Sequence, residues 1–320
     1  MQNFHDLLRA TMTHGVDQFN TRTNKRCRAL VGYQLQYDLA AGFPAVSSKK
    51  LAFNQVKGEL LGFFRGLDNA ADFRALGCTI WDQNANETAA WLANPNRKGH
   101  DDLGRIYGKQ WTDWKDRRVI TSPVDYDRLI AAGYRCVMRD VDGVSMLMER
   151  SINQLENALR TILTNPSDRR TIVSGWNPAE LDQMALPPCH MDYRFVAMED
   201  TKALHVVMTI RSWDLFLGAP FNIASTALFL EIMARLAGYT PATVTIQATN
   251  AHIYYEDHYD QVNEQLSRDH FPAPKLVLSE NIRPIADLSE IAGVFTRVEP
   301  ADISLEGYQS HAAIKAPMTA

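Results

Sequence analysis

The sequence predicts an α+β fold in a single domain that spans residues 1–320. β-rich runs and helical patterns follow one another along the chain, and neither an internal repeat nor a low-complexity linker divides it. The run 223–237 is apolar on nearly all sides, which predicts a buried helix that ends at Gly238. The β-rich runs 193–198 and 204–210 predict a pair of strands.

Composition excludes several classes of protein. The chain has 320 residues, a formal net charge of -4 and 46% hydrophobic residues, which fits a sizeable core. Its longest apolar run, around 223–230, is interrupted by Ser225 and Thr226 and is too short to span a bilayer. The first residues lack the basic and apolar regions of a secretory signal. The chain is mildly acidic, whereas a nucleic-acid-binding surface is typically basic. Neither a membrane nor a nucleic acid is therefore expected as a partner.

The cysteines indicate a reducing compartment. They lie far apart without a CxxC pair, which argues against a disulfide framework and a structural zinc, so no metal is expected. The prediction is a cytoplasmic protein, or one of the host cytoplasm if the chain is viral. The four are Cys27, Cys78, Cys136 and Cys189.

In chain order, residues 1–20 show apolar residues at helical spacing and predict a helix. The basic stretch 21–28 is either a solvated loop or an anion clamp suited to phosphate. Residues 29–39 alternate as a strand does. Residues 51–64 predict a helix, and Glu59 lies within its apolar face. A carboxylate there is either a paired structural group or a proton-transfer group whose pKa is tuned by burial.

The middle of the chain gives weaker signals. The tryptophans between residues 79 and 120 belong either to the core or to a stacking wall for a flat ligand. The irregular pattern over 124–144 predicts a surface insertion. Residues 147–163 predict an amphipathic helix that ends at Asn165-Pro166.

In the second half, residues 169–176 predict a short strand that two arginines open. After the two paired strands and the buried helix, residues 243–247 predict another strand, and residues 250–254 are expected to open a further helix.

Cys189 follows two prolines that fix φ and remove backbone donors, so its sulfur is presented on a stiff turn. A nucleophilic thiol needs nearby positive charge or a base to lower its pKa, and Arg169, Arg170, His190 and Arg211 are candidates. The alternative is a buried cysteine that only fills space.

Several ordered motifs together resemble the thymidylate synthase family, over nearly the whole chain apart from surface insertions near 86–100 and 120–147. They are Asp168-Arg169-Arg170, Trp176-Asn177-Pro178, Met184-Ala185-Leu186-Pro187-Pro188-Cys189-His190, Arg211-Ser212-Trp213-Asp214, Leu217-Gly218-Ala219-Pro220-Phe221-Asn222-Ile223-Ala224-Ser225, Ala251-His252-Ile253-Tyr254 and Ile314-Lys315-Ala316-Pro317.

The resemblance implies a homodimer in which mixed β-sheets pack back to back, with a buried central helix. It also implies a reaction in which 5,10-methylenetetrahydrofolate donates one carbon to C5 of dUMP, giving dTMP and dihydrofolate. Cys189 would add to C6, because C5 is a poor nucleophile until that addition has occurred. The other catalytic residues implied are Glu59, which handles protons, and Asn222, His190, Tyr107 and Asp214.

The resemblance also implies the binding residues. Arg22, Arg211 and Ser212 would hold the 5′-phosphate, with Arg169 and Arg170 reaching across from the partner subunit. His252 and Tyr254 would contact the ribose, and Asn222 would favour uracil over cytosine. The folate contacts would be Lys49, Ile80, Trp81, Asp214, Leu217, Gly218, Phe221 and Ala316, with the C-terminal tail closing over the site.

Two alternatives stay open. A related hydroxymethylase acting on dUMP or dCMP would quench the same methylene intermediate with water, and Asn84, where many family members have a tryptophan, would make the folate pocket wetter. An inactive nucleotide- or RNA-binding regulator is the other alternative, but Cys189, Glu59, Asn222 and the arginines are all present.

Overall fold

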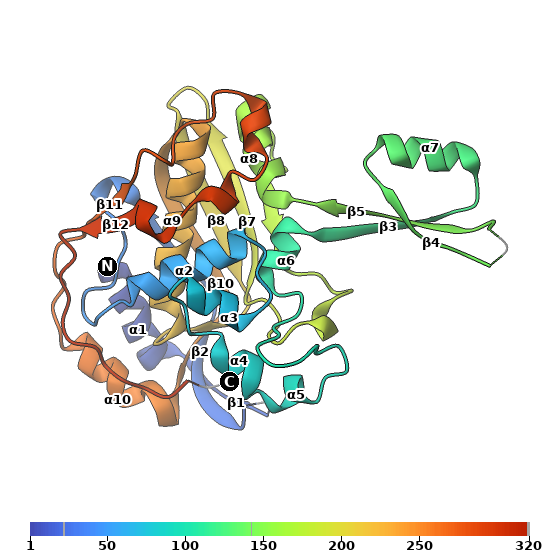
Figure 1. Cartoon of the computed structure of the whole chain (residues 1–320). Helices are drawn as coiled ribbons and strands as arrows, with labels where there is room; N and C mark the ends of the chain where they lie inside the picture. Colours follow the sequence, from blue (N-terminus) through green and yellow to red (C-terminus); the bar gives the residue numbers. More distant parts are fainter. Residues whose placement is uncertain (22, 142, 319–320) are drawn as a thin grey trace.

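The computed structural model describes residues 1–21, 23–141 and 143–318. Its centre is a mixed seven-stranded sheet in the order β1-β2-β10-β8-β7-β6, with β9 paired to β10 (Figure 1). β10 runs parallel to β8 and β9 and antiparallel to β2. The strands are β1 (Val16–Asn20), β2 (Lys25–Asp38), β6 (Ile172–Ser174), β7 (His190–Met198), β8 (Ala203–Ile210), β9 (Trp213–Asp214) and β10 (Thr240–Tyr254).

Helix α9 (Gly218–Ala237) packs along one face of this sheet, against β8 and β10 (Figure 1). It is buried on nearly all sides, and Gly238 ends it in the left-handed conformation at φ 72°. On the sheet, Leu204, Val206 and Met208 alternate into the same core and are fully buried. The predicted mixed sheet with a buried central helix is confirmed.

Further helices complete the layer around α9. α2 (Phe53–Phe64) and α8 (Gln154–Thr164) pack against it, and α10 (Tyr255–Leu266) packs beside α1 (Gln2–His14). The remaining elements are α3 (Ala70–Ala75), α4 (Asp82–Asn86), α5 (Ala89–Leu92), α6 (Tyr107–Thr112), β11 (Lys275–Leu278) and β12 (Ile303–Glu306). Within the described ranges, every helix is too short or too polar to span a bilayer.

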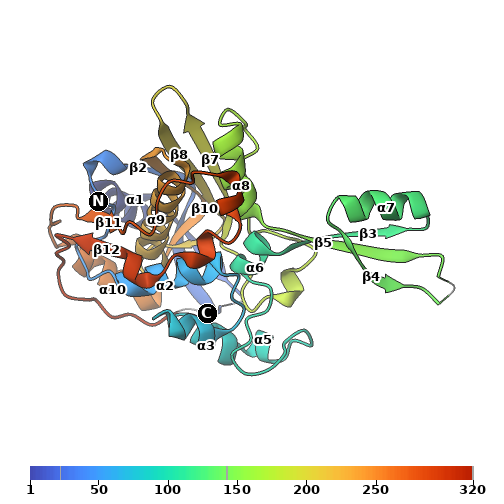
Figure 2. The same ribbon diagram turned by 45° about the horizontal axis from the view of Figure 1, so that its top comes forward.

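An arm projects away from this body (Figures 1 and 2). It consists of an antiparallel sheet in the order β3-β5-β4, together with α7. The bounds are β3 (Trp114–Ile120), α7 (Pro123–Ala131), β4 (Arg135–Arg139) and β5 (Met146–Ile152). Its own small core holds Ile120, Leu129, Tyr134 and Met148. The arm covers the stretch near 120–147 for which the sequence predicts a surface insertion, and its irregular sequence pattern corresponds to ordered strands.

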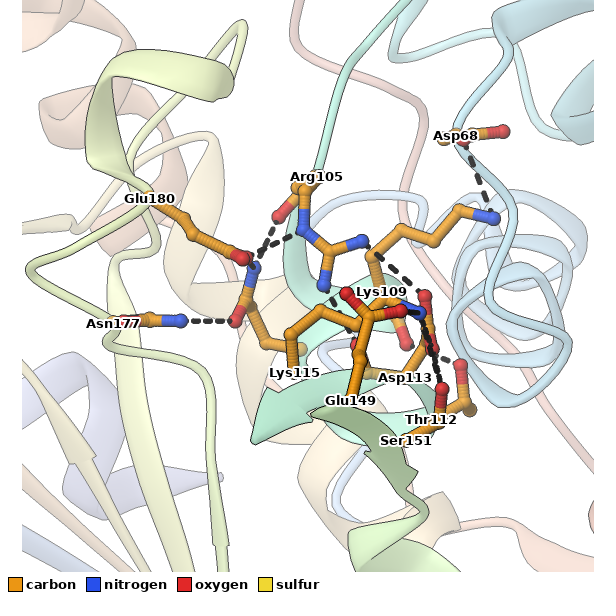
Figure 3. Close-up of polar contacts among 12 residues, drawn as sticks. Asp68, Arg105, Lys109, Thr112, Asp113, Lys115, Glu149, Ser151, Asn177 and Glu180 are labelled. Carbon is orange, nitrogen blue, oxygen red and sulfur yellow. Dashed lines mark hydrogen bonds and ion pairs between the residues drawn. The ribbon is translucent and has the colours of Figure 1, made fainter. Parts of the chain in front are cut away.

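Polar contacts tie the base of the arm to the body (Figure 3). Arg105 Nη2 donates to Asp113 O at 2.7 Å, and its Nε donates to Glu180. Lys115 Nζ lies 2.7 Å from Asp113 Oδ1 and 3.6 Å from Glu149 Oε1. These contacts join β3 and β5 to the segment that leads to Cys189.

Three local predictions are wrong. The pattern over 147–163 divides into β5 and α8, because Met148 points into the core of the arm and Asn153 caps α8 by accepting from Glu156 N. The predicted helix over 1–20 ends at His14, and β1 follows. Residues 250–254 continue β10 beside β2 and β9, so α10 begins only at Tyr255.

The sheet face opposite α9 is only partly covered in this chain. Its side chains include Val31, which is 81% exposed, Val196, which is 42% exposed, and the half-buried Val207. Apolar side chains that alternate outward on a sheet are typical of a face that packs against another layer.

Candidate active site

The Pro187-Pro188 turn holds Cys189 immediately before β7. Cys189 is half-buried, and its backbone N–H donates to Tyr107 Oη at 2.6 Å. Arg211 Nε and Nη2 donate to the carbonyl oxygens of Pro188 and Pro187, each at 2.9 Å. The turn is therefore fixed from two sides, and a guanidinium lies next to the thiol segment.

Glu59 on α2 is buried, with 8% of its surface exposed. Burial raises its pKa from 4.5 to about 7, and the nearby Trp81 indole N–H opposes this rise only in part. Among the described residues, Trp81 Nε1 makes no hydrogen bond of normal geometry, so it lowers the pKa of Glu59 only weakly. A carboxyl with this pKa can both accept and donate a proton near neutral pH.

Tyr107, at the start of α6, links these groups. Its ring stacks on Phe63 at 4.9 Å between centroids and lies 5.9 Å from Trp81 and 5.6 Å from His190. Burial, followed by the charge of Cys189, raises its pKa well above the ordinary value of 10. Tyr107 is therefore a neutral hydroxyl at the centre of the cluster.

His190 and Asn222 form the other wall. Burial lowers the pKa of His190 to about 4, which the neighbouring Asn222 opposes, so its ring is neutral at pH 7. His190 Nδ1 lies 3.1 Å from Tyr193 Oη. Asn222 lies near the start of α9, and its Oδ1 accepts from Trp213 Nε1 at 3.0 Å. The two side chains offer neutral donors and acceptors, and His190 directly follows Cys189 in the chain.

A mostly apolar wall adjoins this cluster. Lys49 is buried within it, and its Nζ donates to Phe216 O and lies 3.5 Å from the centroid of the Phe216 ring. Burial lowers the pKa of Lys49 to about 8, which the charge of Asp214 opposes. The other predicted folate residues in this region are the buried Trp81 and the half-buried Ile80, Leu217, Gly218 and Phe221.

Asp214 connects the wall to the C-terminal tail. Its Oδ1 accepts from Leu217 N at 3.1 Å and lies 3.4 Å from His258 Nδ1. His258 Nε2 lies 3.0 Å from Pro317 O, and Ala316 packs against the core. Burial opposes the charge of both Asp214 and His258, but their mutual attraction outweighs it: the pKa of Asp214 falls and that of His258 rises.

The predicted phosphate residues are dispersed. Arg22 lies outside the described residues. Arg211 has five N–H donors and uses two of them on the proline carbonyls, so it retains donors for an anion. Ser212 is half-buried beside it. Arg169 and Arg170 are exposed in the loop before β6, where Arg170 pairs with Asp168 at 2.7 Å. The structure does not bring these two to Cys189 within one chain.

The predicted ribose residues lie at the end of β10. His252 and Tyr254 are both buried, and their rings are 5.0 Å apart. His252 Nδ1 lies 2.9 Å from Asn250 Oδ1, which fixes the ring. Continuing β10 through these residues places them on the same sheet as Asp214 in β9.

The residues present fit 5,10-methylenetetrahydrofolate. A flat heteroaromatic ligand needs apolar faces and a few placed polar groups. Trp81, Leu217 and Phe221 would supply the faces, and the half-buried Asp214 and the buried Lys49 would supply an acceptor and a donor.

A family model described as thymidylate synthase matches residues 2–320. This chain belongs to the thymidylate synthase family. Proteins named thymidylate synthase from Pseudomonas putida and Bordetella parapertussis are 45% and 42% identical to it, each over 99% of both chains. One from Haemophilus influenzae is 36% identical over 100% of both chains. The predicted membership of the thymidylate synthase family is confirmed.

Sequence reasoning missed three residues of this thymidylate synthase site. Tyr193 orients His190, Trp213 orients Asn222, and His258 joins Asp214 to the tail. Trp213 lies within the recognised motif Arg211-Ser212-Trp213-Asp214, but the acceptor of its indole N–H lies nine positions away, and their contact depends on the turn between β9 and α9. No sequence pattern pointed to a role for His258. The helix that contains it was expected to begin at residues 250–254, whereas α10 begins at Tyr255.

Proposed function

We propose that this chain catalyses the reductive methylation of dUMP by 5,10-methylenetetrahydrofolate, giving dTMP and dihydrofolate. The observation that carries this proposal is the joint placement of Cys189 and Glu59 around Tyr107, in a chain similar to thymidylate synthases over its full length. Such a cluster supplies a nucleophile and a proton carrier within one buried site.

Cys189 is the proposed nucleophile. As the thiolate it forms a bond to C6 of the uracil, and the electron pair of the C5–C6 double bond moves toward C4–O4. Arg211, beside the proline turn, would favour the charged form of the thiol. Glu59 would then handle protons through the water around O4, since its pKa is about 7. Bound methylenetetrahydrofolate supplies the carbon unit and, later, the hydride.

Asn222, His190 and Tyr107 are proposed to position the base. Asn222 can donate to O4 and accept from N3–H, a pattern that uracil offers. His190 is neutral because burial lowers its pKa to about 4, so it can contribute a hydrogen bond without adding charge. Tyr107 holds the backbone of Cys189 in place.

Arg169 and Arg170 are proposed to complete the phosphate site of a partner subunit, together with Arg22, Arg211 and Ser212 of that subunit. Support comes from their exposure beside β6 and from the partly uncovered apolar face of the sheet. A homodimer that packs these faces together would bury Val31 and Val196 and bring the arginines to a second site.

His252 and Tyr254 are proposed to bind the ribose. The proposed folate residues are Lys49, Ile80, Trp81, Asp214, Leu217, Gly218, Phe221 and Ala316. Asp214 would act both on the folate and, through His258, on the tail, whose docking excludes water from the site. The cytoplasmic location stays a prediction.

The hydroxymethylase alternative is not favoured. The relatives compared above are named thymidylate synthase. Asn84 is buried, with 8% exposed, so its amide does not open the wall to solvent. An inactive regulator is also disfavoured, because Cys189, Glu59 and Asn222 lie around one buried centre.

The test is to incubate the purified protein with dUMP and methylenetetrahydrofolate, to follow dihydrofolate by absorbance and to weigh the nucleotide. We expect dihydrofolate in equal amount to a nucleotide heavier by one methyl substitution. A hydroxymethyl mass without dihydrofolate would establish the hydroxymethylase instead. Absence of both products would refute one-carbon transfer.

A further inference from the structure

Trp213 lies in β9 directly under the base-reading side chain. It is fully buried, and its Nε1 is 3.0 Å from Asn222 Oδ1. Gly218, one turn before Asn222 in α9, lies close to this oxygen: a Cβ there would be in van der Waals contact with it at 3.4 Å. The amide of Asn222 is therefore held between the indole and the His190 ring, which also interacts with it.

The indole settles which way the amide faces. An indole N–H can only donate, so the atom facing it must be the amide oxygen. The amide nitrogen then points away from the indole. The oxygen has two lone pairs, and the contact with Trp213 uses one of them, so the other can accept a second donor.

The two pyrimidine bases require opposite orientations of this amide. Uracil offers N3–H as a donor and O4 as an acceptor, which match the amide oxygen and nitrogen as they stand. Cytosine offers N3 as an acceptor and a 4-amino group as a donor, so the amide would have to rotate by half a turn. Rotation would set the amide NH2 against the indole N–H, leaving a donor without an acceptor at a position closed to water.

We infer that Trp213 is a positioning residue that fixes Asn222 in the orientation that reads uracil and thereby disfavours cytosine. This inference rests on the proposed function. It assigns discrimination to a residue that does not touch the nucleotide: the indole adds a repulsive element against cytosine to the attraction that Asn222 offers uracil.

The test is Trp213→Phe, which keeps an aromatic ring and removes the N–H. The dissociation constants of dUMP and dCMP are measured without folate, and kcat/KM is measured for both nucleotides with it. We expect the preference for uracil to fall about tenfold, which corresponds to about 1.4 kcal/mol. Trp111→Phe is the matched control: Trp111 is fully buried and its Nε1 has no hydrogen-bond partner among the described residues, so its preference should equal that of the wild type.

A double-mutant cycle with Asn222→Asp separates positioning from a general structural effect. Both oxygens of an aspartate accept, so no rotation is required, and Trp213→Phe should add no further change in base preference to that variant. An equal change in both backgrounds would overturn the inference, as would an unchanged preference in Trp213→Phe. Circular dichroism checks folding, and Trp213→Leu is the second donor-free variant if the first does not fold. If the wild type does not turn over dUMP, the proposed function fails and the inference fails with it.

Discussion

Replacing Glu59 by glutamine is expected to abolish turnover and, at alkaline pH, to stabilise the folded protein. The two effects have one cause, which is that burial raises the pKa of Glu59 from 4.5 to about 7. Between these values the folded protein holds a proton that the unfolded chain has released, so stability falls as pH rises through this window. At 1.36 kcal/mol per pKa unit the whole loss is about 3 kcal/mol above pH 7.

Glutamine has nearly the shape of the protonated acid and never ionises. Glu59→Gln should therefore exceed the wild type in stability by about 3 kcal/mol at pH 8.5 and by about 1 kcal/mol at pH 5. Urea unfolding at the two pH values measures this difference, and kcat for dUMP measures the loss of turnover. Wild-type kcat/KM should also show a titration near pH 7.

Glu231 on α9 provides the matched control. Burial raises its pKa to about 7 as well, but it lies in a hollow with Arg235 and Lys275, away from Cys189. Glu231→Gln should therefore show a similar gain in alkaline stability and normal turnover. If Glu59→Gln shows no gain at pH 8.5, the burial argument is wrong, and if it retains turnover, Glu59 is not the proton carrier.

Three further predictions follow from the site and the core. Cys189→Ala should lose all turnover and still bind dUMP within a few-fold of wild type by calorimetry; activity near wild type would exclude Cys189 as nucleophile. Arg169→Ala should be inactive alone, yet regain part of its activity when unfolded and refolded with Cys189→Ala, because mixed dimers would contain one complete site; no regain would place the phosphate within one chain. His5 is buried against Ser48 at 2.8 Å, and burial, followed by the charge of His270, lowers its pKa to about 4. As pH falls, the unfolded chain protonates His5 before the folded protein does, so the free energy of unfolding decreases between pH 6.5 and 4. In urea unfolding, the free energy of unfolding of His5→Phe should therefore fall by about 2 kcal/mol less than that of the wild type between pH 7.5 and 4.5. An equal loss in both proteins would show that His5 does not carry this dependence.

Sequence patterns predicted the elements that depend on local chemistry. The run that is apolar on nearly all sides predicted α9, and Gly238 predicted where this helix ends. Both predictions were possible because a buried helix requires apolar residues on every side and the left-handed conformation favours glycine. The Cys189 turn was visible for the same reason, since two prolines constrain their own backbone.

Predictions failed where long-range pairing decides the structure. Met148 and Ile152 fit a helical spacing, but β5 forms because β3 and β4 flank it in the arm. Residues 250–254 looked like a helix start, yet they pair with β2. The contacts of Trp213 and His258 depend likewise on where separate elements meet.

Three contacts of the C-terminal tail are made by its main chain, and Tyr308 and His311 add side-chain contacts to Val46 O and Asp269 O. His258 meets the carbonyl of Pro317, Arg268 donates to the carbonyl of Ala312, and the N–H of His311 donates to Ser47 O. Nearly every residue type has the same main-chain groups. These three contacts therefore depend on the length and path of the tail and not on which side chains it carries. A substitution of the exposed Ala312, which is held through its carbonyl, should consequently be tolerated, whereas removing one residue between Ala312 and Pro317 would move Pro317 O away from His258.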